Sequence, residues 1–163
     1  MSVEERVNSG KRFERQWAAS ADRFGGTKVF RIPDKIFVSG NHIRSTESEA
    51  DFFWFSESGS AIVECKAKAG KSIPFNMLRD HQRDSLVEFS RYMDAIVAVN
   101  LYDPENIRAW NRCFHVPIAV WEELRNALGR KSLPLQVLED DDRIMEFPRI
   151  KGSMWDMEAG IPR

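Results

Sequence analysis

The chain of 163 residues is poor in cysteine and histidine and has no apolar run long enough to cross a membrane. Its two cysteines, Cys65 and Cys113, make no disulfide framework and lack metal-ligand spacing, so we expect two reduced thiols in the core. The three histidines are scattered and form no HxxxH pair. No basic-then-apolar segment follows Met1, so the pattern of a secretory signal is missing. Together these absences predict a cytoplasmic protein without a membrane span.

The sequence also lacks a phosphate-binding loop and an overall basic charge. Ser9-Gly10-Lys11 has none of the flanking glycines of such a loop. The net charge of −1 argues mildly against a nucleic-acid partner, for which a basic surface is expected. Basic residues nevertheless cluster in two stretches, 6–23 and 66–83, while acid is concentrated at 139–142. A locally basic face can hold phosphates on a neutral protein, although an ordinary solvated surface explains the same clusters.

The apolar pattern predicts one α/β domain over residues 1–163. Hydrophobic residues make up 42% of the chain and charged residues 30%, an ordinary globular balance. Helical or alternating patterns predict helices at 2–24, 79–92 and 119–128, and strands at 29–32, 51–55, 60–68, 95–102, 112–117 and near 144–147. Residues 39–49 are polar and predict a loop, and no internal repeat is evident. This order favours an α/β sandwich, with helices flanking a central mixed β-sheet.

The predicted hairpin at 51–68 concentrates charge on one face of a strand. A four-residue loop after Phe55 pairs that residue with Ser60 and places Asp51 opposite Glu64, with both side chains on one face. Lys66 lies on the same face, two residues farther along. Two opposed carboxylates repel each other, and a divalent cation such as Mg²⁺ offsets that repulsion because it prefers hard oxygen ligands. The spacing therefore favours a metal site.

Two alternatives to this reading remain open. A Glu-x-Lys triplet is common, and Glu64 and Lys66 could form a surface salt bridge on an exposed strand. The register also depends on the assumed loop length, because a slip of one residue would move Asp51 to the other face.

Two polar residues sit on helical stripes that are otherwise apolar. Glu14 lies within the stripe of Phe13 and Trp17, and Gln82 continues the stripe of Leu86. A carboxylate that faces a core needs a partner, and a metal or its bound water would serve Glu14. The alternative is a first helix that is more exposed than its pattern indicates.

Five segments in order resemble a known family. Asp51 followed by Glu64-Cys65-Lys66 matches the PD-(D/E)XK nuclease signature. The wider set resembles the RecU-type Holliday junction resolvases, especially their phage-borne relatives, in segments 10–14, 61–66, 71–75, 81–82 and 131–135. The resemblance implies a restriction-endonuclease-like sandwich and a metal-dependent endodeoxyribonuclease. It also implies a homodimer that resolves four-way DNA junctions by paired symmetric nicks, in the host cytoplasm if a phage encodes it.

The resemblance also implies roles for individual residues. Asp51 and Glu64 would be ligands of Mg²⁺, for which Mn²⁺ can substitute, and the Cys65 carbonyl would complete the coordination. Lys66 would be the catalytic lysine, with Glu14 as an accessory acid and Gln82 as a helper. The DNA contacts predicted from the basic stretches are Lys11, Lys68, Lys71, Arg79 and Arg83.

The sequence departs from the family pattern in two places. Glu49-Ala50 precedes the aspartate where the family has proline or another small residue, so Glu49 could replace or assist Asp51. Residues 39–49 are too few for the full stalk that cellular members carry before the aspartate. The sequence leaves open a restriction-like or repair nuclease of the same fold, or a DNA-binding module without chemistry.

Overall fold

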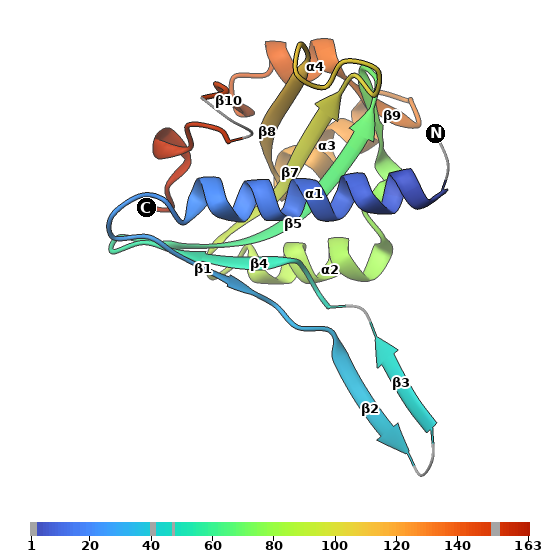
Figure 1. Ribbon diagram of the computed structural model, residues 1–163, viewed down its shortest axis with the longest axis vertical. Helices are drawn as coiled ribbons and strands as arrows, with labels where there is room; N and C mark the ends of the chain where they lie inside the picture. Colours follow the sequence, from blue (N-terminus) through green and yellow to red (C-terminus); the bar gives the residue numbers. More distant parts are fainter. Residues whose placement is uncertain (1–2, 40–41, 47, 151–153) are drawn as a thin grey trace.

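The structure, a computed structural model, describes residues 3–39, 42–46, 48–150 and 154–163. Its centre is a six-stranded mixed sheet in the order β1-β4-β5-β7-β8-β10 (Figure 1). These strands are β1 Lys28–Arg31, β4 Phe52–Phe55, β5 Ser60–Ala69, β7 Asp94–Tyr102, β8 Asn111–Pro117 and β10 Met145–Phe147. The α-helices within these described residues are α1 Val3–Ala21, α2 Asp80–Phe89, α3 Ile118–Ala127 and α4 Leu135–Asp140. The predicted α/β sandwich with a central mixed sheet is confirmed.

Helices cover both faces of the sheet because its central strands are apolar on both sides. On one face, Phe13 and Trp17 of α1 pack with Ala61 and Val63 of β5. On the other face, a second cluster joins Leu86 of α2, and residues of α3, to the sheet. Figure 1 shows α1 crossing the sheet on the opposite side from α2 and α3. The alternation along β5 thus sends odd-numbered residues toward α1 and even-numbered residues toward α2.

The hairpin of β4 and β5 has the register that the sequence predicted. Phe55 pairs with Ser60, and Phe52 pairs with Val63. β5 then runs parallel to β7, with Glu64 beside Val97, and α2 lies between the two strands in the chain. The first helix ends at Ala21, three residues before its predicted end, and its predicted start at Ser2 lies outside the described residues.

The predicted loop at 39–49 is wrong in part. The structure has a second strand pair, β2 Lys35–Ser39 and β3 His42–Thr46, which are antiparallel. Residues 40, 41 and 47 lie outside the described residues. Residues 42–46 have no alternating apolar pattern that would predict a strand. Backbone pairing with β2 defines β3 instead. Figure 1 shows this hairpin projecting well beyond the sheet from the segment between β1 and β4.

A short ribbon joins two segments that the sequence analysis did not relate to each other. β6 Ser72–Pro74 pairs antiparallel with β9 Ser132–Pro134, where breaks and irregular chain had been expected. The ribbon is extended at both ends, because Phe75 N donates to Lys131 O at 3.1 Å and Leu135 N donates to Lys71 O at 2.9 Å. The paired segments read KSIPFNML at 71–78 and KSLPLQVL at 131–138, so the chain does contain a short repeat, contrary to expectation. A 3₁₀ helix, Phe75–Met77, follows β6, as α4 follows β9, and a second 3₁₀ helix spans Glu158–Gly160.

Candidate active site

Glu64 is a buried carboxylate in the middle of the sheet. It lies on the α2 side of β5, 2% exposed, within the otherwise apolar buried run 61–65. Oε1 of Glu64 accepts hydrogen bonds from Lys66 Nζ at 2.6 Å and from Gln82 Nε2 at 2.7 Å. The side chain of Lys66 is itself only 13% exposed. The reading of these two residues as an exposed surface salt bridge is therefore excluded.

Gln82 connects the helix to the strand, as its place on the apolar stripe of α2 indicated. Its Oε1 accepts the Lys66 ammonium at 3.0 Å and the backbone N–H of Arg79 at 3.2 Å. The Gln82 side chain thus touches both charged groups and the start of α2. A buried amide that is bonded on both its oxygen and its nitrogen holds its neighbours in one arrangement.

Asp51 lies just before β4, outside its paired register, and its side chain bonds to β5 next to Glu64. The paired register of β4 ends at Phe52, and the backbone N–H of Asp51 donates to Val63 O at 3.1 Å. The side-chain Oδ2 of Asp51 then accepts the backbone N–H of Cys65 at 2.8 Å. The carboxylate substitutes for a backbone acceptor, which fixes Asp51 beside the residue that follows Glu64.

Burial raises the pKa of both carboxyls, and the charge of Asp51 raises that of Glu64 further. Burial, opposed by the Cys65 hydrogen bond and reinforced by Glu14, raises the pKa of Asp51 to about 6. Burial, reinforced by the charge of Asp51 and opposed by Lys66, raises the pKa of Glu64 to about 8. Both shifts mean that the ionised pair is costly here without further positive charge.

Glu14 lies near this pair and has a partner that the sequence analysis missed. Its Oε2 is 3.0 Å from Arg31 Nη1 of β1, and its side chain is 17% exposed. Glu14 raises the pKa of both Asp51 and Glu64, whereas Arg31 lowers the pKa of Asp51. Nothing in the local pattern of β1 singles out Arg31, because only the packing of α1 on the sheet brings it to Glu14.

The residues present fit a divalent cation. Within the described part of the chain, no group donates a hydrogen bond to Oε2 of Glu64, although that atom is buried. No cluster of three or more His, Cys, Asp or Glu side chains converges on a metal position in the described residues. Mg²⁺ needs no such cluster, because it usually takes one or two protein carboxylates and keeps several waters. Buried Glu64, with one unpaired oxygen, and half-buried Asp51, both of raised pKa, are a donor set of this kind.

Of the predicted DNA contacts, Lys68 and Arg79 adjoin residues of this site. Lys68 lies on the same strand as Lys66, two residues along, and is half-buried. The backbone N–H of Arg79 donates a hydrogen bond to Gln82. The side chain of Arg83 forms ion pairs with Asp84 and Asp80. The two remaining residues, Lys11 on α1 and Lys71 before β6, are exposed. Glu49 is half-buried and immediately precedes Ala50, which is fully buried.

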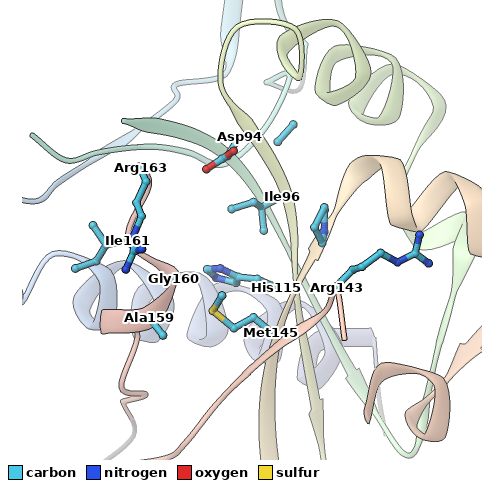
Figure 2. A pocket seen from close by; sticks show the side chains of 11 residues that line it. Asp94, Ile96, His115, Arg143, Met145, Ala159, Gly160, Ile161 and Arg163 are labelled. Carbon is cyan, nitrogen blue, oxygen red and sulfur yellow. The ribbon is translucent and has the colours of Figure 1, made fainter. Parts of the chain in front are cut away.

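The two cysteines and His115 are core residues. Burial raises the pKa of both thiols, and both cysteines are free, as predicted. His115 Nε2 accepts the indole N–H of Trp17 at 2.8 Å, and burial lowers the pKa of His115 to about 3. A hollow of about 410 Å³ opens beside His115 between the starts of β7 and β10 and the C-terminal residues (Figure 2). It lies on the α1 side of the sheet, away from the side chains of Glu64 and Lys66.

Comparisons with known proteins add no assignment. No protein-family model matches the chain, and a search of the curated proteins finds no match. In the described residues, no helix is both long and apolar enough to span a membrane.

Proposed function

We propose that this protein is a metal-dependent endodeoxyribonuclease that resolves four-way DNA junctions. The observation that carries the proposal is the proximity of half-buried Asp51 to buried Glu64, two carboxyls of raised pKa, with the ammonium of Lys66 hydrogen-bonded to Glu64. Strongly shifted pKa values that arise from burial and from like charges are typical of functional sites. A purely structural role would leave the buried Oε2 of Glu64 unexplained.

The chemistry asked of the site is hydrolysis of a phosphodiester. Water adds to phosphorus, the bond to the leaving oxygen breaks, and negative charge grows on the phosphate oxygens. Asp51 and Glu64, with the Cys65 carbonyl, would hold Mg²⁺ or Mn²⁺, and such an ion would supply a water of lowered pKa and offset the charge of the phosphate. Lys66 stabilises the developing charge, and because Glu64 and Gln82 already hold its ammonium, little reorganisation is needed. Gln82 is a positioning residue, and Glu14 adds a further carboxylate at the edge of the site.

Two considerations support branched DNA as the substrate. The ordered segments resemble RecU-type junction resolvases of phages, which would act in the cytoplasm of the host. The projecting hairpin of β2 and β3 stands just before Asp51, where members of that family carry a stalk (Figure 1). Resolution needs two nicks on opposing strands, and a two-fold homodimer supplies two equivalent sites.

A panel of labelled substrates tests this proposal. A four-way junction, a three-way junction, linear duplex and single strands are incubated with the protein in Mg²⁺, in Mn²⁺ and in EDTA. We expect paired nicks in the four-way junction alone, and only with metal. Equal cutting of linear duplex would instead favour a restriction- or repair-like nuclease. Binding of junctions without any cutting would favour a non-catalytic DNA-binding module.

A further inference from the structure

A hollow of about 930 Å³ with cationic walls lies at the start of α2. We call it the basic hollow. Its charged lining consists of four cationic side chains and one carboxylate: Arg79, Arg125, Arg130, Lys131 and Asp80. Apolar residues in and beside the 3₁₀ helix that follows β6 complete the lining. Only Arg79 among these cations was a predicted DNA contact. A gathering of positive charge is notable in a chain whose net charge is −1.

The ribbon of β6 and β9 builds the basic hollow. Lys131 precedes β9, and its carbonyl accepts the backbone N–H of Phe75, which directly follows β6. This bond holds the turn that carries Arg130 and Lys131 against the segment that leads to Arg79. Arg125 comes from the last turn of α3. Cations from three separate segments are therefore fixed around one space.

The basic hollow is linked to the hydrogen-bond network of the candidate active site through Arg79. Arg79 lines the hollow, and its backbone N–H donates to Gln82 Oε1, the same atom that accepts the Lys66 ammonium. A polymer with one phosphate at Lys66 would meet further cations around the hollow that Arg79 lines. A small anion can occupy only one of these two places, Lys66 or the basic hollow. A DNA strand carries a phosphate at every nucleotide and can occupy both.

We infer that the basic hollow holds the phosphodiester backbone of the DNA strand that is cut, beyond the scissile phosphate. This inference rests on the proposed function and adds a second contact region to it. Arginine predominates in the hollow, and its planar guanidinium suits phosphate oxygens. The hollow's one carboxylate, Asp80, lies 3.5 Å from Arg83, which offsets its charge. Glu122 lies 3.6 Å from Arg125 at a partly exposed pair, where such contacts are weak and yield readily to phosphate.

The test compares a double variant, Arg130→Ala with Lys131→Ala, with the wild-type chain. Both side chains are exposed, so the fold should survive, and thermal unfolding checks this. A four-way junction is bound without divalent metal over a range of salt concentrations. Each phosphate near the cut is then replaced, one at a time, by an uncharged methylphosphonate. Arg91→Ala, at an exposed cation beyond the other end of α2, is the matched control.

We expect the double variant to bind the junction about tenfold or more weakly, with a salt slope smaller by about 2. At one or more positions, a methylphosphonate should weaken the wild-type complex but leave the double variant unaffected. The charge-conserving variant, Arg130→Lys with Lys131→Arg, should behave like the wild type, as should Arg91→Ala.

An unchanged salt slope, or methylphosphonate effects that are the same in wild type and double variant at every position, would overturn the inference. The proposed function is judged separately, by metal-dependent cutting of the junction at saturating protein. If the hollow variants bind the junction normally and the wild type still cuts it, the inference about the basic hollow is wrong and the nuclease proposal is retained. If neither protein cuts or binds any junction, both proposals fail.

Discussion

Asp51 Oδ2 accepts a 2.8 Å hydrogen bond from the backbone N–H of Cys65 on the neighbouring strand. The side chain of Asp51 is thereby fixed to the sheet ladder rather than left on a flexible loop. Because Cys65 follows Glu64 directly, the bond also determines where the two carboxylates stand relative to each other. Sites built on strands hold such groups more precisely than loops do.

Removing the charge of Glu64 or Lys66 should stop DNA cutting without preventing DNA binding. Glu64→Gln keeps the shape of the side chain, and Lys66→Ala removes the ammonium. We expect each to lower the rate of junction cleavage by about 10²–10³, the usual effect of losing one transition-state contact. Gel-shift titration of the same junction should change little. Glu88→Gln, at an exposed position of α2, is the control, and near-wild-type cutting by Glu64→Gln would remove our site assignment.

Divalent metal should bind the protein with release of a proton. The pKa of Glu64 is about 8, so much of this carboxyl is protonated at pH 7 and must ionise to become a ligand. Isothermal titration with Mg²⁺ or Mn²⁺ in buffers of different ionisation enthalpy measures that proton. Metal should also raise the melting temperature of the wild type more than that of Glu64→Gln. Chelation should abolish cutting, and full activity in EDTA would contradict the proposed mechanism.

Stability without metal should fall as pH rises. The folded-state pKa values of Asp51, about 6, and Glu64, about 8, exceed the ordinary values of 3.8 and 4.5. The folded state therefore binds protons more tightly, and this contribution is complete below about pH 4 and lost as pH rises through 6 and 8. Glu64→Gln has no carboxyl to ionise at this position. Its free energy of unfolding should therefore rise by a few kcal/mol relative to wild type between pH 5 and pH 9. Urea unfolding in EDTA at the two pH values measures the gain, and a difference independent of pH would refute the assignment.

The hydrogen bond between Trp17 and His115 should contribute to stability rather than to chemistry. Trp17→Phe leaves the buried Nε2 of His115 without its donor and should lower the free energy of unfolding by about 1–3 kcal/mol. Trp155→Phe is a matched comparison, because the buried Nε1 of Trp155 bonds to no described residue. Urea unfolding at pH 7 should show the larger loss for Trp17→Phe. Equal losses would mean that ring volume alone accounts for both effects.

The working unit should be a two-fold homodimer. Light scattering should give a mass of twice the 18.9 kDa of one chain, at least when junction DNA is present. A cruciform plasmid should be linearised directly, because the two nicks fall within the lifetime of one complex. A chain that remains monomeric on junction DNA, or that releases singly nicked plasmid, would argue against paired nicking.

Local sequence was enough to predict much of the sheet and most of the candidate site. The register of β4 and β5 followed from one loop length, because side chains alternate strictly along a strand. Gln82 was expected near the site because it continues the apolar stripe of a helix that had to pack on the sheet. Glu64 and Lys66 were placed together by their spacing alone, and the structure joins them at 2.6 Å.

Only the tertiary structure decided the contacts between segments far apart in the chain. The ion pair of Glu14 with Arg31 and the hydrogen bond of Trp17 to His115 depend on how α1 lies across the sheet. The basic hollow depends on the ribbon of β6 and β9, whose two strands are about sixty residues apart. Periodicity reports which face of an element is buried, but it carries no information about which other element will cover that face. Those choices were made by packing, where shape and the pairing of buried polar groups select one arrangement.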